Sequence, residues 1–305
     1  MNRIACSIGL LLLLGSAHSF APTSLSSESQ SPSIASSSRL GLFDLGFLSG
    51  GSGGSAASIP STTSARDKIA IDSCKNAIAN PRDKNFPLIE LEFPALAALN
   101  KLGDGSLRST VEAEEANLAF VSKLIGGIAP SFNPFAGAKV TLALSASSTN
   151  NFRSKAETIA KKTGATLVSA SSPSLTQEVG SDGICVFVTP SSRNDYMAAQ
   201  NLAKSGAVKA VVLVNAFAKD PRSVPGGATM AYFLKPLTYN SQIAGYLIRS
   251  YPSSWTVLDA TTKKVLGTFS DEEILVPQTN TPDLRTSGRM VQKSVDERAI
   301  AARNR

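Results

Sequence analysis

Short apolar runs alternate with longer amphipathic stretches along most of the chain, a pattern typical of α/β proteins. Four of the runs are apolar at nearly every position and are predicted to be strands: residues 139–144, 165–170, 183–189 and 207–215. Strands of this kind belong to a sheet that is covered on both faces. Helices are predicted between them, one from a cap at Thr149 or Asn150 to Gly164 and one over residues 193–206.

The segment before these strands is predicted to contain two helices and one further strand. Residues 66–79 and 110–127 have apolar positions at helical spacing. In LIELEF (88–93), Glu90 and Glu92 alternate with apolar residues, so one face of this strand is expected to be buried and the other polar. The two carboxylates could act as a pair of acid–base groups. A polar face that is solvated or contacts a helix is the favoured interpretation.

The C-terminal part is predicted to add a helix, a hairpin and a basic tail. SQIAGYLIRSYPSSW (241–255) reads as a helix that Pro252 ends, and residues 255–270 read as two strands around Thr261 and Thr262. From residue 283 onward the chain could form a basic helix that rests on an anionic membrane surface or a partner, but a frayed terminus is the favoured interpretation. The predicted fold class is therefore α/β: a three-layer, Rossmann-like mixed sheet flanked by helices, with a C-terminal β-hairpin.

The first 65 residues are predicted to be a targeting presequence. Residues 1–19 combine an early cation, a leucine-rich run and a final small-residue triplet, so we expect a signal peptide that is cut before Phe20. The alternative is a membrane anchor or buried helix, but the run is short for a membrane span. Residues 20–65 are rich in serine and glycine and poor in acids, as in a transit peptide and linker. One α/β domain (66–282) and a basic tail (283–305) complete the predicted organisation.

Composition limits the chemistry that the mature domain can perform. His18 is the single histidine, and it lies in the segment predicted to be removed. A serine or cysteine nucleophile with a histidine base is therefore excluded, as is a zinc site with imidazole ligands. Cys74 and Cys185 lie in apolar segments at a spacing that matches no metal site, so they are predicted to be core residues, with a disulfide between them left open. No metal and no cofactor is expected.

The distribution of charge bears on the partners. The net charge is +7, but the cations are spread along the chain without a block of five or more like charges. Nucleic-acid binding is therefore not expected. No stretch after the signal peptide has 18 consecutive apolar residues, so any membrane contact is expected to be peripheral.

A ligand site is predicted where polar residues follow the strands, because ligands of open α/β sheets bind at the carboxyl ends of strands. The turn Ser191, Ser192, Arg193 and Asn194 follows one strand, and Asn215 follows the next. Hydroxyls, a guanidinium and a helix N-terminus suit a phosphate group. A capped strand-to-helix turn without a ligand is the favoured alternative, since serine and asparagine are preferred caps in any protein.

Arg249, Tyr251 and Trp255 form a second candidate site, for a protein partner. A fixed cation with aromatic side chains is a combination enriched at protein interfaces. A structural corner that packs Trp255 explains the same residues equally well.

The motifs LIELEFP, AVVLVNAF, YFLKPL and GYLIRSYPSSW together resemble DUF1995, a domain of unknown function in the plastid and cyanobacterial low photosystem II accumulation family. The resemblance covers residues 65–282. It implies a plastid protein, in the stroma or at the stromal face of the thylakoid, and for one branch a role in photosystem II assembly. The presequence resembles the two-part type of algae whose plastid descends from an engulfed red alga, which is reached through the secretory pathway.

Two functions follow as expectations. The favoured one is a non-enzymatic assembly or interaction factor that meets thylakoid or photosystem II assembly proteins. The alternative is a binding protein or enzyme for a phosphorylated small molecule, a nucleotide or sugar phosphate, held at the turn 191–194. The sequence leaves open whether the chain is an enzyme, and a non-enzymatic role is favoured.

Overall fold

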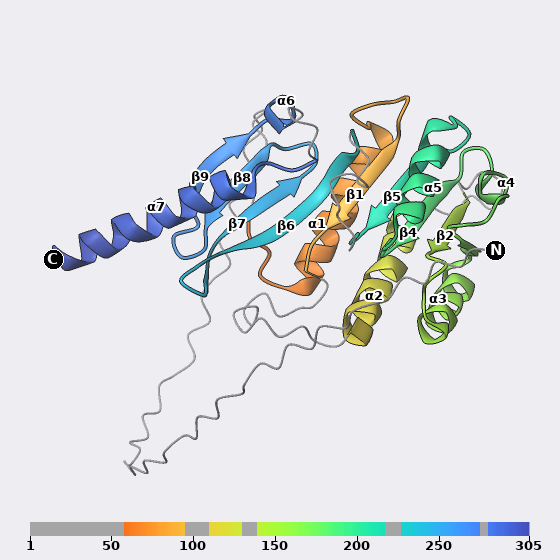
Figure 1. Ribbon diagram of the computed structural model, residues 1–305, viewed down its shortest axis with the longest axis horizontal. Helices are drawn as coiled ribbons and strands as arrows, with labels where there is room; N and C mark the ends of the chain where they lie inside the picture. Colours follow the sequence, from red (N-terminus) through yellow and green to blue (C-terminus); the bar gives the residue numbers. More distant parts are fainter. Residues whose placement is uncertain (1–57, 95–109, 130–138, 217–226, 275–279, 305) are drawn as a thin grey trace, which may run out of the picture. The chain divides into compact units, whose positions relative to one another are not determined.

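The computed structural model describes residues 58–94, 110–129, 139–216, 227–274 and 280–304, and it places nine strands in one sheet (Figure 1). The order across the sheet is β3-β2-β4-β5-β1-β6-β7-β8-β9. The strands are β1 (Leu88–Glu92), β2 (Val140–Leu144), β3 (Thr166–Ser169), β4 (Ile184–Val188), β5 (Ala210–Val214), β6 (Thr229–Tyr239), β7 (Gln242–Ser250), β8 (Trp255–Asp259) and β9 (Val265–Phe269). Neighbours from β3 to β6 are parallel and those from β6 to β9 antiparallel, so the predicted mixed α/β sheet is confirmed, as is the hairpin around Thr261 and Thr262.

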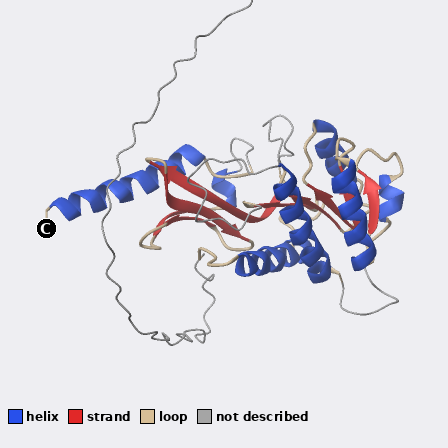
Figure 2. Cartoon of the chain, turned by 90° about the horizontal axis from the view of Figure 1, so that it is seen from below, coloured by secondary structure: helices blue, strands red, loops and turns tan. Residues whose placement is uncertain are grey.

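Helices cover both faces of the sheet, as Figure 2 shows. They are α1 (Thr63–Ala79), α2 (Thr110–Ile128), α3 (Asn150–Thr163), α4 (Leu175–Val179), α5 (Arg193–Lys204), α6 (Asp271–Ile274) and α7 (Leu284–Arg303). The buried side chains of α1, α2 and α3 pack on the face that Ile89 and Leu91 of β1 enter. Those of α4 and α5 pack on the opposite face. Helices α6 and α7 cover the antiparallel strands on the same face as α4 and α5. This double coverage is why the parallel strands are continuous apolar runs.

Local capping decides where two of the helices begin and end. The Thr149 hydroxyl accepts a hydrogen bond from the Phe152 backbone at 3.2 Å, and Gly164 ends α3 in the left-handed conformation, with φ at 72°. Ser192 caps α5 through reciprocal hydrogen bonds with Asp195. The predicted helices over residues 149–164 and 193–206 are confirmed.

The predicted polar face of LIELEF is covered by helix α5 and is not solvated, so of the two predicted forms the structure shows the one that contacts a helix. β1 lies inside the sheet, between β5 and β6, and helices contact it from both sides. Glu90 is 1% exposed, and its Oε2 accepts a long hydrogen bond of 3.5 Å from Asn280 Nδ2. A central strand of a covered sheet buries both faces, whatever its alternation of residue types.

The predicted helix over residues 241–252 is also wrong, because this stretch contains β7, which pairs with β6 in a long antiparallel hairpin. Asn240 and Ser241 connect the two strands with φ angles of 49° and 61°, the positive values that a type I′ turn requires. Residues 244–249 are all buried, so they lack the alternation that identifies a strand. Asn240 was the local signal for a hairpin turn.

The basic residues after 283 form helix α7, which packs on the antiparallel strands. Val291 on its inner side is 1% exposed. Gly245 of β7 permits this contact, since a Cβ atom there would lie 2.4 Å from Val291 Cγ2 and 2.7 Å from the Leu258 carbonyl oxygen. The favoured prediction of a frayed terminus is therefore wrong, and the structure shows the helix, because its apolar side packs on the sheet. No helix in the described ranges is long and apolar enough to cross a bilayer.

Candidate functional site

The chain leaves the neighbouring strands β2 and β4 toward opposite faces of the sheet. Helix α3, which follows β2, packs on the face of α1 and α2, whereas α5, which follows β4, packs on the other face. Ligands of open α/β sheets bind at the carboxyl ends of strands where connections diverge in this way. The two loops meet there, because Ser147 Oγ lies 3.3 Å from Ser191 Oγ. The structure therefore places Ser191 at the switch point of the sheet.

The turn 191–194 already holds an anion, the carboxylate of Asp195. The backbone N–H groups of Ser191 and Ser192 donate to Asp195 Oδ2 at 3.0 and 2.9 Å, and Ser192 Oγ accepts from the Asp195 N–H at 3.2 Å. Arg193 and Asn194 are exposed. A phosphate oxygen would have to compete with this carboxylate for the helix N-terminus. The capped turn is present, and phosphate binding at it stays a prediction.

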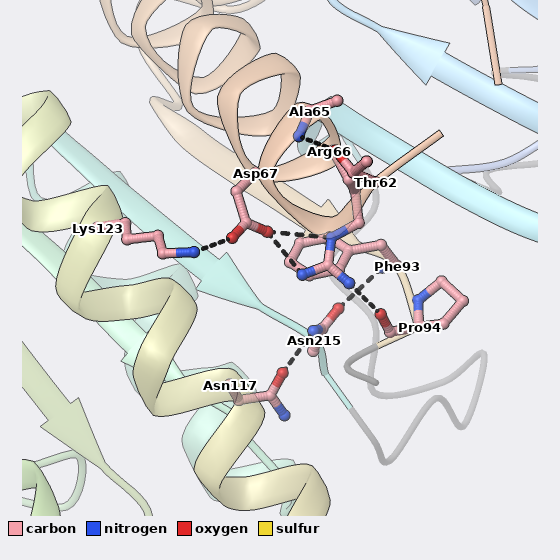
Figure 3. Close-up of polar contacts among 9 residues, drawn as sticks. All are labelled: Thr62, Ala65, Arg66, Asp67, Phe93, Pro94, Asn117, Lys123 and Asn215. Atoms are coloured by element: carbon pink, nitrogen blue, oxygen red, sulfur yellow. Dashed lines mark hydrogen bonds and ion pairs between the residues drawn. The ribbon is translucent and has the colours of Figure 1, made fainter. Parts of the chain in front are cut away.

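The side chain of Asn215 bonds to the end of β1 and to α2 (Figure 3). Its Oδ1 accepts from the Phe93 N–H at 2.9 Å, and its Nδ2 donates to Asn117 Oδ1 at 2.7 Å. Asn215 is buried, with φ at 47°, a left-handed conformation that asparagine tolerates better than most residues. Asn215 therefore hydrogen-bonds to the end of β1 and to α2, and not to the turn 191–194 with which the sequence analysis grouped it.

A charged cluster that the sequence analysis did not identify lies beside this amide pair. Arg66 is 2% exposed; its Nε and Nη2 donate to Asp67 Oδ1 at 3.1 and 2.6 Å, and its Nη1 donates to the Pro94 carbonyl at 2.7 Å. The Lys123 ammonium of α2 lies 2.6 Å from Asp67 Oδ2. The Arg66 guanidinium also stacks over the Phe93 ring, 4.5 Å from its centroid. Figure 3 shows these contacts joining α1, α2 and the end of β1.

Two buried polar atoms near the cluster have no hydrogen-bond partner among the described residues. They are Nδ2 of Asn117 and the hydroxyl of Tyr232, and both residues are fully buried. Burial raises the pKa of Tyr232, so its hydroxyl keeps its proton. An unmatched buried donor costs about 1–3 kcal/mol unless a water or a ligand serves it. The carboxyl end of β1 can therefore offer donors to an oxygen atom.

The structure brings Arg249, Tyr251 and Trp255 together, but inside the protein. The Arg249 guanidinium lies 5.5 and 5.7 Å from the ring centroids of Tyr251 and Trp255. Its Nη2 donates to Asp271 Oδ2 at 2.7 Å, and Trp255 Nε1 donates to Asp271 Oδ1 at 3.2 Å. Arg249 is 3% exposed and Trp255 is 0% exposed.

The predicted helix that would carry Arg249 is a strand, and the Arg249 side chain is buried because helices contact this strand from both sides. Tyr251 reinforces the corner, since its hydroxyl donates to the Asn80 carbonyl at 2.7 Å. These contacts make the corner a structural junction. A role in partner binding stays a prediction.

Both cysteines of the described ranges are free and buried, as expected of core residues. Burial raises the pKa of the Cys74 thiol to about 12, and it raises the pKa of Cys185 as well. The thiolate is the nucleophilic form, so neither thiol is poised to react at neutral pH. Within the described ranges, no three His, Cys, Asp or Glu residues form a group that could hold a metal ion.

Comparison with known proteins identifies the family to which the chain is similar. The model of DUF1995, a domain of unknown function, matches residues 66–272, a range that contains the whole sheet. No curated protein and no solved structure matches the chain.

Proposed function

The chain belongs to the DUF1995 family, and we propose that it is a non-enzymatic plastid factor that binds protein partners during photosystem II assembly at the stromal face of the thylakoid. The role in photosystem II assembly is supported by the resemblance of the chain's motifs to the low photosystem II accumulation family. The observation that carries the binding role is the exposed basic face of α7.

Helix α7 presents a row of cations to solvent. Arg285, Arg289 and Lys293 are spaced four residues apart, so they lie along one side of the helix, and all three are exposed. The exposed carboxylate of Glu297 follows, 3.9 Å from the Lys293 ammonium, and a pair of this kind contributes little. A row of cations attracts an acidic surface and steers it into contact.

The opposite side of α7 is anchored to the sheet. The Asp259 carboxylate at the end of β8 accepts from Ser294 Oγ at 2.8 Å and from Nη1 of Arg298. Val291 packs over Gly245 of β7. Because the helix is already ordered, a partner that binds its cations does not have to order it first. A helix that is held against the sheet on one side and exposes a row of cations on the other is therefore suited to bind a partner protein.

Affinity purification from plastid membranes in mild detergent tests the proposal. The wild-type chain is expected to recover photosystem II assembly intermediates, and an Arg285→Glu, Arg289→Glu variant to recover less of them. Lys161→Glu, Lys162→Glu on α3 makes the same change of charge at exposed positions and serves as the matched control. Recovery without any photosystem II protein, or equal recovery by the α7 variant and the wild type, contradicts the proposal.

The plastid location has its own test. A fluorescent protein fused to residues 1–66 is expected to enter the plastid, and Phe20→Ala is expected to divert it, since an aromatic residue follows the predicted signal-peptide cut. Unchanged import of the variant would remove the argument for this type of presequence.

A second candidate function is a binding site for a phosphorylated small molecule at the switch point. The contact between Ser147 and Ser191 favours it, because two hydroxyls meet where open α/β sheets bind ligands. ADP or glucose 6-phosphate at a hundredfold excess over its dissociation constant would stabilise the protein by about 2.7 kcal/mol. A thermal shift that Ser191→Ala abolishes would support this function over the favoured one.

A further inference from the structure

A groove separates α5 from the loop that follows β3. Its cavity volume is about 380 Å³, and its lining residues are all uncharged. One wall is the side of α5 that carries Asn194, Met197 and Asn201. The other wall is formed by Ser171, Ser172 and neighbours up to Thr176 at the start of α4.

The α5 wall offers two free amides with an apolar side chain between them. Asn194 and Asn201 are seven residues apart, so they project from one side of the helix about 10 Å apart along its axis. Both are exposed, and neither side chain hydrogen-bonds to another described residue. Met197 lies between them and is 47% exposed, so its flexible apolar side chain is accessible to a ligand. The α5 wall of the groove therefore combines two amides, which make directional hydrogen bonds, with the flexible apolar side chain of Met197.

The facing wall supplies acceptors. The hydroxyls of Ser172 and Ser174 both donate to the Glu178 carboxylate, the first at 2.7 Å. With its proton committed to Glu178, the Ser172 oxygen is left to accept a hydrogen bond from a ligand N–H.

The chemistry of the two walls indicates the class of ligand. A primary amide pairs with a peptide group through one donor and one acceptor. An extended peptide rises about 3.3 Å per residue, so about three residues span the distance between the two asparagines. A phosphate would meet no cation among the lining residues, and a sugar ring would meet no aromatic face.

We infer that this groove binds an extended, uncharged peptide segment of a partner protein through its backbone amides. Asn194 and Asn201 hold the backbone at two points, and Met197 contacts the side chain between them. The site lies on α5 and goes beyond the function proposed for α7, so it stands even if the basic face of α7 binds nothing.

An array of blocked nonapeptides, composed of Ala, Ser, Thr, Val and Gln, tests the inference with the full-length chain. The strongest binder is then measured by fluorescence polarisation. Asn194→Ala and Asn201→Ala are each expected to weaken binding about tenfold, since each removes a pair of hydrogen bonds. Gln292→Ala, an exposed helical amide on α7, is the matched control and is expected to leave the affinity unchanged. Methylation of the peptide's backbone nitrogens is expected to abolish binding.

Several outcomes would overturn the inference. They are the absence of any binder in the array, equal affinity for the wild type and an Asn194→Ala, Asn201→Ala double variant, and a preference for charged over uncharged peptides. Both asparagines are exposed, so the variants are expected to keep the wild-type melting temperature. If a variant unfolds, chemical-shift mapping of the peptide on the wild-type protein decides the question, because contacts away from α5 contradict the site.

Discussion

The guanidinium of Arg249 on β7 forms an ion pair of 2.7 Å with Asp271 at the start of α6, and the same carboxylate accepts from the indole of Trp255. One carboxylate therefore fastens two strands to a helix. Removal of one partner from a buried ion pair leaves the other charge without compensation, which is more costly than the loss of an exposed pair.

Arg249→Ala is expected to lower the free energy of unfolding by about 3 kcal/mol, the low end for a buried pair because Asp271 keeps some contact with water. Trp255→Ala, which empties a core position, is expected to cost about 3–5 kcal/mol. Arg193→Ala is the control: the residue is exposed, and its loss is expected to change stability by about 0.5 kcal/mol or less. Urea denaturation followed by circular dichroism measures all three. Wild-type stability of Arg249→Ala would show that the corner is not a structural junction.

Asp259 is expected to make the protein sensitive to acid. Burial by itself would raise the pKa of this carboxyl, but hydrogen bonds from two backbone N–H groups, Arg298 and Ser294 hold the pKa well below its usual range. A group with a depressed pKa in the folded state contributes stability above its unfolded pKa, about 3.9 for Asp, and loses it as the pH falls below that value. Asp259→Asn is therefore expected to be less stable than the wild type at neutral pH.

The difference between Asp259→Asn and the wild type is expected to shrink as the pH falls toward about 3. Urea titrations at several pH values measure it, with the fluorescence of Trp255, the single tryptophan of the chain, as the signal. A difference that stays constant with pH would mean that the charge of the carboxylate does not anchor α7.

Gly245→Ala is expected to lift α7 from the sheet. The added methyl group would lie 2.4 Å from Val291 Cγ2 and 2.7 Å from a backbone oxygen, and overpacking of this kind costs about 1–3 kcal/mol. Gly126→Ala is the matched control, since nothing lies within 4 Å of a Cβ atom there and alanine favours a helix interior by about 0.5–1 kcal/mol. The melting temperature should fall in the first variant and rise in the second. An unchanged melting temperature of Gly245→Ala would contradict the close packing of α7 on the sheet.

Cys74 and Cys185 are expected to resist alkylation while the protein is folded. Burial raises the pKa of both thiols, that of Cys74 to about 12, so the reactive thiolate is scarce at neutral pH. Iodoacetamide treatment with and without guanidinium, followed by peptide mass spectrometry, checks this. Rapid labelling of either cysteine in the native protein would indicate a reactive thiol in an accessible environment.

Part of the candidate site was readable from the sequence, and part was not. Ser191 was placed at a strand end by a local pattern, and its position at the switch point follows from the order of strands. The hydrogen bond between Asn117 and Asn215 joins residues 98 positions apart, so no pattern within a short stretch of sequence predicts it. Arg66 and Asp67 read as ordinary polar residues near the start of a helix, and only their position against the end of β1 makes them a buried cluster.

The sequence by itself determined the features that depend on near neighbours in the chain: the cap at Thr149, the left-handed end of α3 at Gly164, and the apolar runs that become parallel strands. Tertiary structure alone decided which polar residues are buried. Glu90 and Arg249 have polar, ionisable side chains, yet both lie inside because helices cover both faces of their strands. A run such as 242–250 is apolar enough for a helix or a strand, and its partner strand β6 settles the choice. Burial and pairing depend on contacts between distant segments, whereas capping and periodicity depend on residues a few positions apart.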